Sequence, residues 1–294
     1  MKNVLVVGAG YMGGGIAQVV AQAGYSVYLH DSNPASLEKA LKEISWSTEK
    51  LGKKGLLRDS AAAVRKRIKP AADLSVARDC QMIIEAVYED EGIKKQLFAR
   101  LEDVCPGGTI IATNTSIIPI TRLSADMRHP ERLVGTHFFG PVPIMKLVEV
   151  IKGEKTSDAV FEKSVEFISS IDKYPVRVMK DIPGFVMNRI NAMAAQEAFD
   201  LVEKGVAAPE DIDIGMRYGF GWTVGPFEIT DNSGIDTALL VNMAWRSLLG
   251  KDVTVSPLLE KLVKAGRTGR KAGKGFYDYL PDGKKQPFDL RKLD

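Results

Sequence analysis

The chain has 294 residues, of which 45% are hydrophobic and 26% are charged, and its formal net charge is +3. This length favours two domains, each with a core of its own, and no apolar run is long enough to span a membrane. The basic residues are interspersed with acidic ones instead of forming a stripe, which argues against a nucleic-acid partner.

The two cysteines, Cys80 and Cys105, have neither the spacing of a metal site nor that of a disulfide framework. We therefore expect both to be small packing residues in a reducing compartment, the cytoplasm, and we expect no metal. After Met1-Lys2-Asn3 the chain enters an apolar strand directly, so no cleavable signal is expected.

Short β-rich runs alternate with helix-length amphipathic segments in the first half of the chain. Such alternation predicts an α/β fold with a doubly wound, mostly parallel Rossmann-type sheet. The segment after the second strand is expected to form a helical hairpin inserted into this domain. The expected strands are 4–7, 26–29, 82–86, 109–112, 133–136 and 147–151, with helices such as 14–23, 36–51 and 92–104 between them.

The alternation of strands and helices ends at the Pro-Gly segment Asp181-Ile182-Pro183-Gly184. This segment divides a first domain, 1–183, from an expected all-helical second domain, 184–294. The amphipathic run after it ends at Gly205, a suitable helix C-cap, and PEDID predicts a helix start at Pro209. Residues 219–234 are expected to form a long glycine-rich loop. The basic stretch GRTGRKAGKGFYDY is either a solvated loop or a contact for an anion.

The first strand leads into a glycine motif, Gly8-Ala9-Gly10-Tyr11-Met12-Gly13, that matches G-x-G-x-x-G and is followed by a helix-like segment. In this context Gly8 suits the tight turn, Gly10 lets the backbone approach a pyrophosphate, and Gly13 lets the helix pack closely on the strand. The helix N-terminus then offers N–H groups and a positive dipole end to phosphates. The motif predicts a dinucleotide site.

Asp31 ends the next strand, where its carboxylate can accept hydrogen bonds from both ribose hydroxyls of an adenosine. Because a 2′-phosphate would be repelled there, NAD is favoured over NADP. The other interpretation is that Asp31 only begins the turn before Pro34.

Three histidines are present, and His137 is the best candidate for chemistry. His30 is expected to be structural and His129 to lie in a polar surface loop. A dehydrogenase needs a group that removes the hydroxyl proton, and imidazole suits this because its pKa lies near neutral pH. Glu149, on the following strand, could return beside His137 and orient it. The alternative is a core histidine with a surface glutamate.

Another expected strand ends in the polar cluster Ala112-Thr113-Asn114-Thr115-Ser116. Ligands of open α/β sheets bind beyond the carboxyl ends of the strands, where this cluster and His137 would both lie. The cluster favours the chemical interpretation of His137 over the structural one.

Across nearly its whole length the sequence resembles the L-3-hydroxyacyl-CoA dehydrogenases, including the bacterial 3-hydroxybutyryl-CoA dehydrogenases. The resemblance rests on an ordered series of motifs: GAGYMGGGIAQ, IIEAVYED, ATNTS, HFFGPVPIMKLVEV, DIPGFVMNRI, GPFEITDNSGID and GRKAGKGFYDY. It implies NAD-dependent interconversion of (3S)-3-hydroxyacyl-CoA and 3-oxoacyl-CoA, a place in fatty-acid metabolism, and a homodimer formed through the C-terminal domain.

The resemblance also implies roles for single residues. His137 looks like the catalytic base and Glu149 like its orienting carboxylate. Ser116 matches a serine that binds the 3-oxygen of the substrate, and Asn188 an asparagine on the thioester side. Glu89, Lys94 and Lys271 match further cofactor contacts. The other expected cofactor contacts are Ser116, Asp31 and the motif residues Gly8, Gly10, Tyr11, Met12 and Gly13. Ser47 and Lys54 match contacts to coenzyme A.

The chain departs from many members at Gly140, where they have asparagine after His-Phe-Phe. Glycine removes an amide contact toward the cofactor and could widen the space by the nicotinamide. The loop with Phe220 and Trp222 is also bulkier in aromatic residues than expected for the family. These two differences leave the length and shape of the acyl chain undetermined. Two other functions remain possible at this stage: a dehydrogenase of a free 3-hydroxy acid, and a dinucleotide-binding protein without catalysis.

Overall fold

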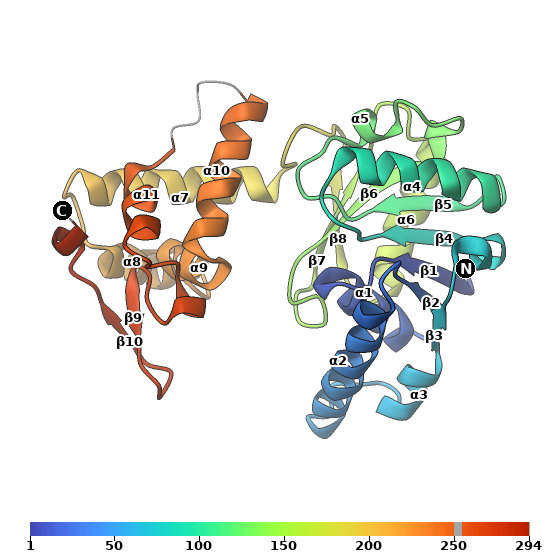
Figure 1. The fold of residues 1–294 in the computed structure, drawn as a ribbon, viewed down its shortest axis with the longest axis horizontal. Coiled ribbons are helices and arrows are strands. Elements are labelled where there is room, and N and C mark those ends of the chain that lie inside the picture. Colours follow the sequence, from blue (N-terminus) through green and yellow to red (C-terminus); the bar gives the residue numbers. More distant parts are fainter. Residues whose placement is uncertain (250–254, 294) are drawn as a thin grey trace. The chain divides into compact units, whose positions relative to one another are not determined.

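The computed structural model describes residues 1–249 and 255–293 and divides into two compact units, Met1–Phe185 and Val186–Asp294 (Figure 1). Each unit has its own cluster of buried hydrophobic side chains. No helix in the described ranges is both long and apolar enough to cross a membrane.

An eight-stranded sheet forms the centre of the first unit, in the order β3-β2-β1-β4-β5-β6-β7-β8. Strands β1 to β6 are parallel, β7 runs antiparallel to β6, and β8 is parallel to β7. This arrangement confirms the doubly wound, mostly parallel sheet. The bounds are β1 Asn3–Val7, β2 Ser26–His30, β3 Ile68–Ala71, β4 Met82–Glu85, β5 Ile110–Thr113, β6 Leu133–Phe138, β7 Leu147–Ile151 and β8 Tyr174–Val178.

Two of these strands, β3 and β8, were not expected from the sequence. Both lie at an edge of the sheet and both contain a proline, Pro70 and Pro175. Edge strands tolerate proline and polar residues because one side of their backbone has no strand partner. Their sequences therefore lack the apolar run that marks a central strand.

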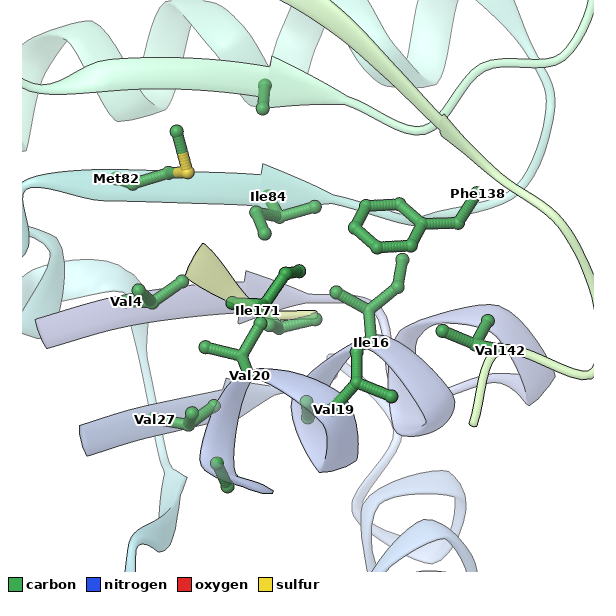
Figure 2. Packing of buried hydrophobic residues seen from close by; sticks show 14 of the residues in the cluster. Val4, Ile16, Val19, Val20, Val27, Met82, Ile84, Phe138, Val142 and Ile171 are labelled. Carbon is green, nitrogen blue, oxygen red and sulfur yellow. The ribbon is translucent and has the colours of Figure 1, made fainter. Parts of the chain in front are cut away.

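Helices cover both faces of the sheet (Figure 1). Ile16, Val19 and Val20 of α1 pack against Val4 and strand residues beside it, in the cluster that Figure 2 shows. α6 contributes to the same cluster, whereas α4 lies on the other face. The helices of this unit are α1 Tyr11–Gln22, α2 Pro34–Lys53, α3 Ala61–Lys66, α4 Glu91–Val104, α5 Ile120–Ser124 and α6 Asp158–Ser170, with short 3-10 helices at Leu74–Asp79 and Pro130–Arg132.

The second unit is mainly helical, and its core contains three mutually packed rings. The ring centroids of Phe199, Phe227 and Phe276 lie 4.7–5.7 Å apart. The bounds are α7 Met187–Glu203, α8 Pro209–Phe220, α9 Pro226–Ser233, α10 Ile235–Leu249, α11 Pro257–Lys264, β9 Tyr277–Tyr279 and β10 Lys285–Pro287, with 3-10 helices at Arg270–Ala272 and Leu290–Leu293.

Two features of this unit correct the sequence-based expectation. The expected loop 219–234 contains helix α9, whose first N–H groups, on Phe227 and Glu228, donate to the Asp213 carboxylate at 2.9 and 3.1 Å. Because Asp213 belongs to α8, this cap is a tertiary contact that local sequence does not reveal. The second feature is the antiparallel hairpin of β9 and β10, so the unit is not purely helical.

Candidate active site

The three motif glycines differ in the reason for having no side chain. Gly8 has φ +101°, and a Cβ there would lie 2.4 Å from the Ala86 oxygen; at Gly13 it would lie 1.8 Å from the Gly8 oxygen. Packing within the protein therefore requires both. Gly10 has φ −71°, and a Cβ there would meet no protein atom within 4 Å. The open space at Gly10 lies at the N-terminus of α1, where a phosphate fits.

A crevice extends from this motif along the carboxyl ends of β1, β2 and β4. Gly10, Tyr11, Asp31, Val87 and Tyr88 are among the residues that line it. Such a crevice at the carboxyl edge of a parallel sheet suits a dinucleotide.

The Asp31 carboxylate is held at the end of β2 by two backbone donors. Ala9 N–H donates to Oδ2 at 2.7 Å and Asn33 N–H donates to Oδ1 at 2.8 Å. The turn contact considered above is therefore real. It does not preclude ribose binding, because a carboxylate has about four acceptor positions and Asp31 also lines the crevice.

Lys94, Glu85 and Glu89 form a buried ion network beside the ends of β4 and β5. Lys94 Nζ is 2.6 Å from Glu85 Oε1 and 3.2 Å from Glu89 Oε2, and the Lys94 side chain is only 1% exposed. Thr113 Oγ1 donates to the other Glu85 oxygen at 2.6 Å. Burial raises the pKa of Glu85, although Lys94 and Thr113 oppose this shift.

Glu89 connects this network to Ser116. Its Oε1 accepts hydrogen bonds from Thr115 Oγ1 at 2.5 Å, from Ser116 N–H at 2.8 Å and from Ile117 N–H at 3.2 Å. Burial raises the pKa of Glu89, but Lys94 and these hydrogen bonds outweigh it, and the pKa is lowered. An ionised Glu89 thus fixes the turn that carries Ser116.

His137 and Glu149 are direct partners on antiparallel strands β6 and β7. The distance from His137 Nδ1 to Glu149 Oε2 is 2.8 Å, and the two residues are 6% and 0% exposed. The alternative of a surface glutamate is therefore wrong. The rings of Phe139 and Phe185 flank the imidazole, with centroids 4.5 and 5.9 Å away. A carboxylate at Nδ1 leaves Nε2 to exchange a proton with a ligand.

Asn114, from the predicted polar cluster, and Lys173, which the sequence did not single out, hold the chain after His137. Asn114 Oδ1 accepts a hydrogen bond from Phe138 N–H at 2.9 Å, which ties the ends of β5 and β6 together. Lys173, 6% exposed, donates from Nζ to the carbonyls of Val142 and Met145 at 2.6 and 2.7 Å. Glu85 was missed as well, although a charge inside the apolar run MIIEAV was a usable signal.

The other predicted residues of the first unit lie where their elements suggest. Ser47 is in α2 and Lys54 caps its C-terminus, so the two lie near one helical face seven residues apart. His30 Nδ1 is 3.0 Å from the Ala71 carbonyl oxygen, and His129 is exposed near Glu131. Both free cysteines are buried, as expected of packing residues; they are Cys80 and Cys105.

Two predicted site residues belong to the second unit. Asn188 is in the first turn of α7. Lys271 is in the 3-10 helix Arg270–Ala272, where its Nζ lies 2.6 Å from Asp236 Oδ2. The expected site residues therefore come from both units of the chain.

Family models match both units. Residues 3–182 match the NAD binding domain of 3-hydroxyacyl-CoA dehydrogenase, and residues 184–279 match its C-terminal domain. The chain belongs to the 3-hydroxyacyl-CoA dehydrogenase family. The predictions of this family, of an enzyme and of NAD as its cofactor are confirmed at that level.

Individual members of the 3-hydroxyacyl-CoA dehydrogenase family are similar over nearly the whole chain. A probable 3-hydroxybutyryl-CoA dehydrogenase of Deinococcus radiodurans is 43% identical, covering 93% of this chain and 99% of that protein. The mitochondrial hydroxyacyl-coenzyme A dehydrogenase of Homo sapiens is 40% identical, covering 95% and 91%. The crystal structure of (S)-3-hydroxybutyryl-CoA dehydrogenase from Ralstonia eutropha is 36% identical, with a TM-score of 0.89 and coverage of 95% and 99%.

Proposed function

We propose that this protein interconverts (3S)-3-hydroxyacyl-CoA and 3-oxoacyl-CoA with NAD. The observation that carries the proposal is the buried His137–Glu149 pair. It lies at the carboxyl edge of the same sheet whose first strand ends in the dinucleotide motif. Site geometry supports the reaction class, and similarity to the named relatives supports the acyl-CoA substrate.

The residues of the crevice suit NAD. The N-terminus of α1 and the open space at Gly10 would receive the diphosphate, and Asp31 would accept hydrogen bonds from the adenosine ribose. When bound, NAD supplies the acceptor for the hydride that leaves carbon 3 of the substrate. Gly8 and Met12 also line the crevice, and Gly13 lets α1 pack closely against Gly8.

His137 would act as the general base in oxidation and as the general acid in reduction. Glu149 fixes Nδ1–H and stabilises the imidazolium, so Nε2 removes the proton of the 3-hydroxyl group. The pair is oriented before substrate binds, because the register of β6 and β7 places the two residues opposite each other. Such preorganisation avoids a conformational cost during the reaction.

Ser116 would bind the 3-oxygen of the substrate as a positioning hydroxyl, and Asn188 would bind the thioester side. Glu89 and Lys94 are proposed to act on NAD chiefly by holding the Ser116 turn, because the Lys94 ammonium is buried between two carboxylates. A contact of Lys271 with NAD rests on the resemblance alone.

Coenzyme A would be recognised in part by α2. Ser47 supplies a hydroxyl and Lys54 a positive charge for phosphate, and the two lie near one side of the helix. A free 3-hydroxy acid on the same fold is the second candidate substrate, and it would make no use of these two residues.

Homodimer formation through the second unit is also proposed. Helices α7 and α10 carry exposed apolar side chains, including Ile190, Met193, Leu240 and Met243, which a symmetric partner could cover. A cytoplasmic location and a role in fatty-acid metabolism stay predictions. Analytical ultracentrifugation of the full chain tests the dimer, and a monomer at micromolar concentration would contradict it.

The reaction is tested by comparing reduction of acetoacetyl-CoA with that of free acetoacetate, using NADH. We expect the CoA ester to have the higher kcat/KM by a wide margin, and equal values would favour the free-acid function. His137→Ala should lower kcat by about 10²–10⁴-fold while NADH still binds. A variant with wild-type turnover would contradict the role of His137.

A further inference from the structure

Gly140 lies on the loop that follows β6, three residues after His137. The space that a side chain at this position would need is taken by Tyr11. A Cβ atom there would lie 2.8 Å from Cε1, 3.2 Å from the hydroxyl oxygen and 3.4 Å from Cζ of Tyr11. The three nearest atoms thus all belong to one ring. Gly140 is not among the residues with positive φ, so its backbone does not require glycine. The ring of Tyr11 is what excludes a side chain.

Tyr11 is the first residue of α1, directly after Gly10, and it lines the dinucleotide crevice. The side chain of this aromatic residue is largely free of protein cover, since the residue is 67% exposed. Asp31 marks the adenosine end of the crevice. Tyr11 instead reaches toward the loop after His137, and this is the direction in which the nicotinamide half must extend for hydride transfer. The space that glycine was expected to widen is therefore occupied.

The loop beyond Gly140 is held firmly against α1, so the loop side of the contact with Tyr11 is fixed. A Cβ at Gly15 would lie 2.9 Å from Val142 Cβ, which shows how closely the helix approaches the loop (Figure 2). Val142 is buried, and its carbonyl accepts a hydrogen bond from Lys173. An added side chain at position 140 would thus move the exposed Tyr11 ring rather than the loop.

We propose that Tyr11 is a positioning residue for the nicotinamide half of NAD, and that position 140 is glycine because any side chain would displace the Tyr11 ring. The ring forms a wall of the crevice where the ribose and nicotinamide lie. This inference rests on the NAD-dependent function proposed above. It assigns a function to Tyr11 beyond its place in the glycine motif.

The test is a double-mutant cycle read out by NADH affinity, from fluorescence titration in the absence of substrate. Gly140→Ala and Tyr11→Leu should each raise the Kd of NADH about three- to tenfold, the value of an aromatic contact. In the Tyr11→Leu background, Gly140→Ala should change Kd less than about twofold, because no ring remains to be displaced. Tyr11→Phe, which keeps the ring, should bind NADH within about twofold of wild type.

Tyr88 provides a matched control. It is an aromatic residue that lines the same crevice and is 78% exposed. None of its atoms is among the three nearest to a Cβ added at Gly140. Effects of Tyr88→Leu and Gly140→Ala should therefore be additive. Thermal unfolding of all variants separates lost affinity from lost folding, and we expect midpoints close to wild type because the displaced ring is exposed.

Additive effects of Tyr11→Leu and Gly140→Ala, or a Gly140→Ala variant with wild-type affinity, would overturn the proposal. So would a Tyr11→Leu variant that raises the KM of the acyl-CoA substrate but leaves NADH affinity unchanged. Failure of the NAD-dependent function itself is distinguishable, because in that case the wild-type protein would not bind NADH.

Discussion

Gly10→Ala separates ligand binding from folding at the glycine motif. Alanine can adopt the extended backbone of Gly10, with φ −71° and ψ −170°, and its Cβ would meet no protein atom within 4 Å. The free energy of unfolding should therefore stay unchanged or rise by up to about 1 kcal/mol, because alanine restricts the unfolded chain. The methyl group would instead project into the space proposed for the diphosphate.

The loss of NADH affinity follows from the contacts that the methyl group prevents. Each hydrogen bond from a backbone N–H group to a charged phosphate is worth about 1.5–3 kcal/mol. Losing one such bond raises Kd about 10- to 150-fold. Gly13→Ala should behave differently and destabilise the fold, since its Cβ would lie 1.8 Å from the Gly8 oxygen.

The measurements are NADH fluorescence titration and urea unfolding of the same preparations. Gly107→Ala is the matched control, because a Cβ there also meets nothing within 4 Å and the residue does not line the crevice. It should leave NADH affinity unchanged, and its unfolding free energy should stay unchanged or rise by up to about 1 kcal/mol, as for Gly10→Ala. If Gly10→Ala binds NADH like the wild type, or unfolds as readily as Gly13→Ala, the assignment of this space to the diphosphate is refuted.

Three further predictions concern the charged groups that support the site. Glu149→Gln should lower kcat at least about tenfold at unchanged NADH affinity. The glutamine oxygen can still accept the His137 proton, but the negative charge that stabilises the imidazolium is lost; an unchanged kcat would contradict this role. Lys94→Met should lower the unfolding free energy by about 3–5 kcal/mol, since two carboxylates lose a buried partner. Lys95→Met removes a more exposed ion pair and should lower it by at most about 1 kcal/mol. Similar losses for the two variants in urea titrations would argue against the buried network. Burial lowers the pKa of Lys173 to about 8 from 10.5, so between these values the unfolded chain binds a proton that the folded protein does not. Wild-type stability relative to Lys173→Met should then rise with pH in this window, by at most about 1.4 kcal/mol per pH unit, and a fall would show that the folded pKa is not lowered.

Much of the sheet and one half of the site could be predicted because their signals are local. The apolar run before Gly8 and the run before His137 each mark a central strand, and the parallel order places both ends at one edge. Glu149 was identified because it lies on the strand that follows His137. The edge strands β3 and β8 and helix α9 were missed, since the first two lack an apolar run and the third is capped by Asp213 from another helix.

The sequence by itself determined the fold class and the dinucleotide motif, because strand and helix periods and short motifs are properties of neighbouring residues. It made His137 and Glu149 candidates for a pair, and the register of β6 and β7 decided their contact. Only the tertiary structure decided that Lys94 is buried between carboxylates instead of exposed on a helix, that Gly10 alone among the motif glycines leaves open space, and that the ring of Tyr11 occupies the space beside Gly140. These properties depend on close packing between segments far apart in the chain. Such packing is set by the path of the backbone through space, which no local pattern specifies.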